Sequence, residues 1–300
     1  MRISRGILCL FLVSLWISIS GNAGANASPL GQVELQTLVA SSVAITSVPS
    51  TLSPTLGEVS RDVPSTKLSN VGACGNPLKL CIYGAVKSKG LIVLTGDSHA
   101  LMWAPPLAAV AQALGFRLGL TWLPGCPSTT VTQPACTSFK AKVDATIAAQ
   151  RPSLVILAER TAGVAAQSRW PDSNVDWAQG LAGRMLRLEK SSKVALLYDT
   201  PPMPASPAAC LAIDPNQVQR CGAPLVSPNP LLQTKSQAEH DAVRFAHATG
   251  IDPLPWLCAT RCSPIIGTSV VYYDQTHLAT SWVMRLTSVL QAKVAPLVKR

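Results

Sequence analysis

The sequence predicts a doubly wound α/β domain, in which helices cover both faces of a parallel sheet. The main observation is that short apolar runs alternate along the chain with segments whose apolar residues recur at helical spacing. The composition agrees, because 48% of the 300 residues are hydrophobic and only 13% are charged. A soluble domain usually carries about 25% charged residues, so this composition excludes a disordered chain and a coiled coil.

Five short, largely apolar runs predict the buried strands of this sheet. In chain order they are Leu91–Thr95, Phe116–Trp122, Leu154–Ala158, Val194–Tyr198 and Ile251–Trp256. The last run contains Pro253 and Pro255, and proline sits poorly inside a sheet because it lacks a backbone N–H.

Five stretches with apolar residues at helical spacing predict the helices between and after these strands. The first is the Ala- and Leu-rich segment His99–Leu114, which Gly115 closes. The others are marked by Phe139, Val143 and Ile147; by Trp177, Leu181, Met185 and Leu188; by Ala238, Ala242, Phe245 and Ala246, with Gly250 as the expected cap; and by Val283, Leu286 and Leu290.

The N-terminal residues 1–27 have the pattern of a secretory signal peptide. Arg2 and Arg5 precede the apolar run Ile7–Ser20, and the small residues Ala25 and Ala27 mark a cleavage site before Ser28. The run is short for a transmembrane span, although an uncleaved anchor is the alternative. We therefore expect an exported protein, in the periplasm, in the cell envelope or outside the cell.

Residues 28–70 are rich in Ser, Thr, Val and Pro and lack a long periodic pattern, which predicts a flexible linker before a catalytic domain over residues 71–300. Removal of the leader lowers the formal net charge from +10 to +8. That charge indicates a solvated basic surface or attraction to an anionic envelope or glycan. No Lys/Arg cluster with interleaved aromatic residues is present, so nucleic acid is not an expected partner.

Eight cysteines remain after the leader, and an even number in an exported protein predicts disulfides. They fall into four close pairs, which makes local bridges the simplest expectation: Cys74–Cys81, Cys126–Cys136, Cys210–Cys221 and Cys258–Cys262. The spacing of the last pair also suits zinc, but no second Cys/His pair with such spacing accompanies it. We expect neither a metal nor a cofactor.

The first motif that carries chemistry is Gly96-Asp97-Ser98-His99, directly after the first predicted strand. A serine on a tight strand-to-helix turn presents its hydroxyl above the sheet. The helix start supplies N–H groups and a positive dipole end that can hold an oxyanion. Alone, the motif is also an ordinary turn and helix cap. Asp97 and His99 are candidates for lining the pocket.

The second motif is Asp274-Gln275-Thr276-His277, just before the last predicted helix. A nucleophilic serine needs a nearby base, and the base needs an orienting carboxylate; an Asp three residues before a His supplies both. Each residue alone could be structural, but the chain holds only four histidines. We therefore expect Ser98 as the nucleophile, His277 as the base and Asp274 as its orienting acid.

Together these motifs resemble the first and last blocks of the SGNH/GDSL hydrolase superfamily. The branch that the chain most resembles is the extracytoplasmic SGNH domain of bacterial membrane O-acyltransferases. Three further segments carry that resemblance: Leu123–Pro127, Val155–Arg160, and Asp199–Pro202 followed by Cys210 and Cys221. The resemblance implies a three-layer, flavodoxin-like sheet and serine-dependent acyl chemistry.

The chain also departs from that branch, since Thr161 stands where a Trp is usual and the Asn of the third block has no clear counterpart. The oxyanion hole therefore carries over only in part. The N–H of Ser98 is the first candidate donor, and the N–H of Gly125 and the Arg160 side chain are further candidates. The alternative role of Arg160 is a surface ion pair with Glu159 or another acid.

The resemblance implies O-acyl transfer, with acetyl as the expected acyl group, to a cell-envelope glycan through an acyl-enzyme on Ser98. No transmembrane acyltransferase is fused within the chain, so a separate membrane acyltransferase is an expected partner and acyl donor. A secreted carbohydrate or lipid esterase or deacetylase is the alternative. A non-catalytic glycan-binding accessory protein is the second alternative.

Overall fold

The computed structural model describes residues 28–130, 133–161, 174–226 and 230–298, so the predicted signal peptide lies outside the described residues. Its centre is a six-stranded sheet with the strand order β1-β3-β2-β4-β5-β7. The strands are β1 (Cys81–Gly84), β2 (Leu91–Gly96), β3 (Arg117–Trp122), β4 (Leu154–Ala158), β5 (Lys193–Leu197) and β7 (Thr249–Ile251).

The five strands β2, β3, β4, β5 and β7 are parallel, each overlaps one of the five predicted runs, and their order is flavodoxin-like. Strand β1 was not predicted and pairs antiparallel with β3 at the edge of the sheet. Its side chains are only partly buried, so it lacks the apolar run that marks β2 and β4. The predicted fifth strand is too long, because β7 ends at Ile251 and the 3₁₀ turn η5 (Leu254–Trp256) follows Pro253.

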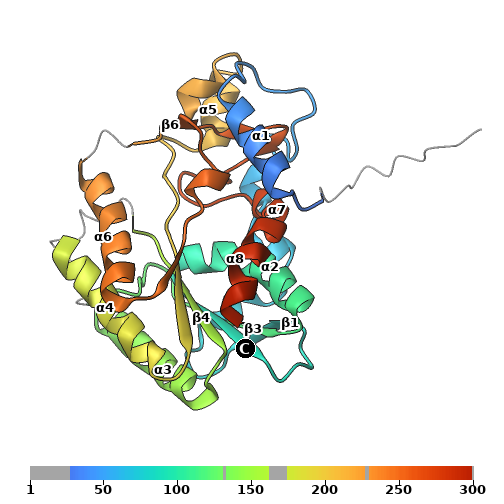
Figure 1. Cartoon of the computed structure of the whole chain (residues 1–300). Coiled ribbons are helices and arrows are strands. Elements are labelled where there is room, and N and C mark those ends of the chain that lie inside the picture. The colour runs from blue at the N-terminus through green and yellow to red at the C-terminus, as the bar shows by residue number, and fades with distance from the viewer. Residues whose placement is uncertain (1–27, 131–132, 162–173, 227–229, 299–300) are drawn as a thin grey trace, which may run out of the picture.

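Helices cover both faces of the sheet, as predicted for a three-layer domain (Figure 1). One face packs on α2 (Ser98–Leu114), α7 (Thr280–Arg285) and α8 (Thr287–Val298). The other packs on α3 (Pro134–Gln150), α4 (Asn174–Glu189) and α6 (Pro230–Ala246). Alternate residues of β2 belong to the two cores, since Ile92 joins the first and Val93 the second. This alternation is the period-two geometry of a strand buried on both faces.

Two predicted helix ends differ from the structure. The last helix is divided, because α7 stops at Arg285 and α8 begins at Thr287. Helix α6 ends at Ala246, where His247 takes a positive φ of 53°, and not at Gly250. Gly250 belongs to β7 instead, where a Cβ would lie 2.1 Å from the hydroxyl oxygen of Tyr198. That glycine therefore serves close packing in the sheet.

The prediction of a flexible linker over residues 28–70 is wrong. This segment contains the helix α1 (Gln32–Ser42) and packs on the first core through Leu30, Leu35, Val39 and Val59, each at most 3% exposed. Burial of these apolar side chains stabilises the segment despite its Ser/Thr-rich composition. Its remaining turns and the smaller elements of the domain are η1 (Val59–Arg61), η2 (Pro64–Thr66), η3 (Val71–Gly75), α5 (Pro207–Ile213), η4 (Val218–Cys221), β6 (Ala223–Pro224), β8 (Arg261–Cys262), β9 (Ile265–Ile266) and β10 (Ser269–Val270).

The four predicted disulfides are present: Cys74–Cys81, Cys126–Cys136, Cys210–Cys221 and Cys258–Cys262. Since Cys258 is bonded to Cys262, these two residues are not free thiolates for zinc. Across residues 28–298, apart from the gaps named above, no helix has the length and apolar character needed to cross a membrane.

Candidate active site

Ser98, His277 and Asp274 form a chain of hydrogen bonds at the carboxyl ends of the parallel strands. The Oγ atom of Ser98 lies 2.8 Å from Nε2 of His277. The Nδ1 atom of the same ring lies 2.8 Å from Oδ2 of Asp274. This is the spatial order that a nucleophile, a base and an orienting acid require. The structure thus brings together the three residues that the two motifs indicated.

Ser98 owes its position to the tight turn between β2 and α2. Strand β2 ends at Gly96, where a Cβ would lie only 1.8 Å from the carbonyl oxygen of Ala158 on β4. The turn can therefore approach β4 only with glycine at this position. Asp97 caps α2, since its Oδ1 accepts from the N–H of His99 at 2.8 Å. The serine hydroxyl then stands at the N-terminus of a 17-residue helix.

Asp274 organises the loop that carries His277. Its Oδ1 accepts from the N–H of Thr276 at 2.8 Å and from the N–H of His277 at 2.7 Å. Burial would raise the pKa of Asp274, but the hydrogen bonds from His277 and from these two amides outweigh burial and lower the pKa to about 2. The ring of Tyr273 stacks on that of His277 with a centroid separation of 5.4 Å.

His99 is buried beside His277, and the hydroxyl of Ser98 bonds to His277 and not to His99. Its Nδ1 lies 2.7 Å from Oδ1 of Asp199, and its ring centroid is 4.8 Å from that of His277. Burial favours the neutral imidazole, yet the facing carboxylate of Asp199 outweighs it and raises the pKa of His99. Asp97 and His99 are each 2% exposed, so they support the site from below and do not line an open pocket.

The three oxyanion candidates have different surroundings. The Ser98 N–H stands at the first position of α2, where N–H groups have no partner within the helix. Gly125 takes a φ of 59° in the turn after β3, and Leu123 of that turn donates to the carbonyl of Gly96 at 3.1 Å. The N–H of Arg160 donates to Oδ2 of Asp97 at 2.9 Å, so this N–H is already used within the protein.

Two buried acids behind the site were missed at the sequence level. Asp199 follows β5, and its Oδ2 accepts from the N–H of Thr161 at 2.8 Å. Glu239 on α6 accepts from the hydroxyl of Thr161 at 2.9 Å and from the N–H of Asp199 at 3.2 Å. Burial, with Asp199 close by, raises the pKa of Glu239. Asp199 could have been found, because it stands at the carboxyl end of a strand, where sites in such sheets form.

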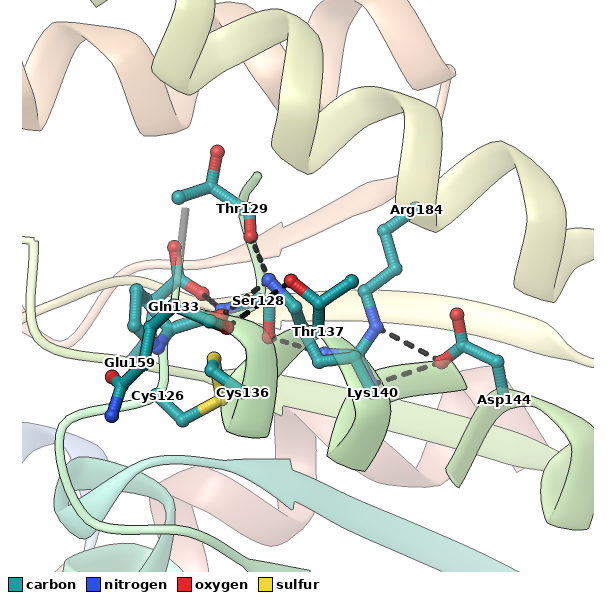
Figure 2. Close-up of a disulfide and its surroundings, with 11 residues drawn as sticks. Cys126, Ser128, Thr129, Gln133, Cys136, Thr137, Lys140, Asp144, Glu159 and Arg184 are labelled. Atoms are coloured by element: carbon teal, nitrogen blue, oxygen red, sulfur yellow. Dashed lines mark hydrogen bonds and ion pairs between the residues drawn. A yellow bond between two sulfur atoms is a disulfide. The ribbon is translucent and has the colours of Figure 1, made fainter. Parts of the chain in front are cut away.

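The disulfide Cys126–Cys136 closes a loop that contacts the end of β4 (Figure 2). In this loop the N–H of Ser128 donates to the carboxylate of Glu159, which is fully buried. Burial and the nearby Asp97 raise the pKa of Glu159 to about 7.

Basic side chains of α3 and α4 complete this contact. Arg184 donates to the Ser128 hydroxyl at 3.0 Å and pairs with Asp144, and Lys140 donates to the carbonyl of Thr129. The loop after β3 is thereby tied to β4, α3 and α4.

No curated protein matches the chain. Among solved structures, the periplasmic domain of the lipopolysaccharide acetyltransferase of Salmonella ser. Paratyphi A is similar, with 14% identity and a TM-score of 0.57 over 74% of this chain and 86% of that one. A candidate acylhydrolase from Bacteroides fragilis NCTC 9343 has 13% identity and a TM-score of 0.47 over 77% of this chain and 98% of that one.

At such low identity, the similarity to the acetyltransferase domain supports the fold alone. A family model gives the assignment: the SGNH domain, described as fused to AT3 domains, matches residues 65–292 and thus well over half of the sequence. The chain therefore belongs to the SGNH domain family.

Proposed function

We propose that this chain transfers an acyl group, most simply acetyl, to a hydroxyl of a cell-envelope glycan through an acyl-enzyme on Ser98. The observation that carries the proposal is the hydrogen-bond chain from Ser98 through His277 to Asp274. Membership of the SGNH family supports ester chemistry in general. The similar periplasmic acetyltransferase domain supports an exported enzyme that acts on a glycan.

In the first half-reaction, Oγ of Ser98 attacks the carbonyl carbon of an acyl ester or acyl carrier while Nε2 of His277 takes the hydroxyl proton. The carbonyl electron pair moves onto oxygen, where the Ser98 N–H at the start of α2 stabilises the charge. When this pair returns, the bond to the leaving group breaks and His277 protonates that group. Asp274 orients the ring and stabilises the transient imidazolium.

In the second half-reaction, His277 removes the proton from a glycan hydroxyl, whose oxygen attacks the acyl carbon. The tetrahedral intermediate collapses, the acceptor leaves acylated, and the proton returns to Ser98. Attack by water would instead release the free acid. Positioning of the acceptor and exclusion of water decide between these outcomes, because the triad serves both equally.

The four disulfides support an oxidising location outside the cytoplasm, in agreement with the predicted leader. An exported enzyme cannot draw directly on acyl carriers of the cytoplasm. A separate membrane acyltransferase that passes acyl groups across the membrane is therefore the proposed donor. The net positive charge of the chain favours an acceptor in an anionic envelope.

Hydrolysis of p-nitrophenyl acetate by the protein without its leader tests the enzyme assignment. We expect turnover by the wild type and none above background by Ser98→Ala. Equal rates for the two proteins would contradict an acyl-enzyme on Ser98 and favour a non-catalytic glycan-binding role.

A second assay separates transfer from hydrolysis. The protein is given the same acyl donor with and without an envelope oligosaccharide, and the products are identified by mass spectrometry. Transfer predicts an acylated oligosaccharide that requires Ser98. Release of free acid alone, in the presence of acceptor, would instead identify an esterase.

A further inference from the structure

A second histidine–aspartate pair lies directly under the triad and has no part in the mechanism above. It joins Nδ1 of His99 to Oδ1 of Asp199 at 2.7 Å, with side-chain exposures of 2% and 5%. His99 follows the nucleophile in the chain, whereas Asp199 follows β5. The pair therefore spans from the turn of Ser98 across the end of β4 to the end of β5.

The partners of two carboxylates show what this pair holds in place. Asp97 accepts from the N–H groups of His99 and Arg160. Asp199 accepts from the N–H of Thr161 at 2.8 Å and from the N–H of Thr200 at 2.7 Å. Both peptide N–H groups at the exit of β4, those of Arg160 and Thr161, thus bond to buried acids. Only the ionised form of a carboxyl group offers both oxygens as acceptors.

Two neighbouring buried carboxylates require positive charge nearby, because like charges in a medium of low dielectric oppose each other's ionisation. Burial raises the pKa of Asp97, and the charge of Asp199 adds to this effect, while His99 opposes it. The ionisable groups that act on His99 are Asp199, Asp97 and Arg160.

Four other ionisable groups lie close to this cluster, and one of them, Tyr272, interacts with Asp199. The ring of His277 lies nearby, tilted by 57° to the ring of His99, with a centroid separation of 4.8 Å. Glu159 interacts with Asp97, and Glu239 interacts with Asp199. Glu159 and Glu239 add further acids beside the cation of Arg160, and the ring of His99 is in direct contact with the carboxylate of Asp199.

We propose that His99 is a positioning residue that works as an imidazolium: paired with Asp199, it keeps Asp97 and Asp199 ionised, and these acids hold the exit of β4 beside Ser98. This role rests on the proposed acyl transfer by Ser98. When His99 of the wild type gives its proton to solvent at high pH, Asp97 and Asp199 stay ionised and repel each other; in His99→Gln, one of the two acids instead takes a proton from solvent and gives up an acceptor oxygen. The backbone at Arg160 and Thr161 loses a hydrogen bond and shifts relative to the nucleophile.

The test is the pH dependence of p-nitrophenyl acetate hydrolysis by the wild type, His99→Gln, Asp199→Asn and the double variant. For His99→Gln we expect kcat to fall about 100-fold, the size of effect that a small misplacement of reacting groups produces. KM should change little. Because His99 and Asp199 act as one unit, the double variant should lose no more than the larger single loss.

The pH profile separates this role from a merely structural one. In the wild type, kcat should decline as the pH rises through the pKa of His99, which lies above the usual 6.5. In His99→Gln this decline should be absent. His240→Gln changes an exposed histidine on α6 and is the matched control, with the wild-type profile expected.

A measurement on the wild type covers the case in which His99→Gln fails to fold. The chain holds four histidines, so their ¹⁵N resonances can be followed individually. In the wild type, we expect both nitrogens of the His99 ring to stay protonated above pH 6.5. In Asp199→Asn, this ring should no longer be doubly protonated above pH 6.5. A neutral His99 at pH 6.5, or a His99→Gln profile that keeps the alkaline decline, would overturn the positioning role. A wild type no more active than Ser98→Ala would instead refute the proposed function itself.

Discussion

Nε2 of His277 lies 2.8 Å from Oγ of Ser98, although 179 positions separate the two residues in the chain. The contact arises because Ser98 stands where β2 ends and His277 lies in the loop that leads into α7. Helices α7 and α8 pack on the same face of the sheet as α2. The fold thus places His277 at the start of α2, which carries Ser98.

Asp274→Asn should abolish most of the activity without unfolding the domain. Oδ2 of Asp274 accepts the Nδ1 proton of His277, and an amide nitrogen there would favour the wrong tautomer. A loss of about 10³- to 10⁴-fold in kcat is expected, as in other serine triads. Since the pKa of Asp274 is about 2, the loss should be constant between pH 5 and 9.

Esterase kinetics of this variant measure the loss of activity, and its thermal melting shows whether the domain stays folded. Asp241→Asn removes an acid on α6 that pairs with Arg244 on the surface, and it should keep full activity. An Asp274→Asn enzyme within threefold of the wild type would show that Asp274 has no orienting role.

Gly96→Ala should damage both folding and activity. The new Cβ would meet the carbonyl oxygen of Ala158 at 1.8 Å, and a backbone atom cannot move aside as a flexible side chain can. We expect a melting temperature at least about 10 °C lower or insoluble protein, in line with severe overpacking.

Gly183→Ala is the matched control, because its Cβ would meet only the end of Arg187 at 3.8 Å. Alanine also favours the helical conformation of α4, so this variant should be as stable as the wild type or more so. Equal melting temperatures for the Gly96 and Gly183 variants would refute the close approach of β2 and β4.

The parallel part of the fold was predictable because each inner strand is an apolar run buried on both faces. Strand β2 illustrates this, since all six of its residues are buried. Edge strand β1 and helix α1 escaped prediction for a common reason. Each buries only part of its surface, and α1 relies on a few apolar contacts such as Leu35 and Val39. Tertiary packing, and not local pattern, determines such elements.

The sequence predicted those site residues that lie close together in the chain or in a recognisable motif. It did not predict the residues that only the fold brings together. Asp274 and His277 are three residues apart, and Ser98 lies in a recognisable turn. Asp199 and Glu239, in contrast, acquire their roles from the approach of β4, β5 and α6. No spacing in the sequence links them to Thr161, so only the structure reveals that they hold the exit of β4.

Replacement of Cys126 and Cys136 by serine should lower the free energy of unfolding by about 2–3 kcal/mol, the usual contribution of a short disulfide loop. Urea denaturation measures this loss. The variant should also lose activity, because the closed loop carries Ser128, which donates to Glu159 next to Arg160. Cys74→Ser/Cys81→Ser removes a disulfide from another loop and is the control, with lower stability but retained kcat. Equal kcat values for the two variants would show that the Cys126–Cys136 loop does not contribute to the site.

Asp62→Ala tests whether the segment before residue 71 belongs to the domain. The carboxylate of Asp62 accepts from the N–H and the hydroxyl of Ser281 at the start of α7. Loss of these bonds should lower the free energy of unfolding by about 1–2 kcal/mol, the size of a helix-cap effect. Glu58→Ala, which removes an exposed partner of Thr55, should leave stability unchanged. An equally stable Asp62→Ala protein would argue that the segment packs only loosely on α7.

Glu159→Gln should change how stability depends on pH. The pKa of Glu159 is about 7 in the folded protein, raised chiefly by burial, against about 4.5 in the unfolded chain. Between these values the folded state binds more protons than the unfolded state, so this group makes the wild type less stable as the pH rises from about 4.5 to 7.

Glutamine is neutral at every pH and keeps an oxygen that can accept from Ser128. The variant should therefore match the wild type near pH 4.5 and melt at a higher temperature at pH 8. Thermal melting across this range measures the difference, and Glu34→Gln, at an exposed position of α1, controls for the loss of one charge. A Glu159→Gln protein that is less stable than the wild type at pH 8 would show that the ionised carboxylate is stabilised by Ser128 and Lys140 more than burial penalises it.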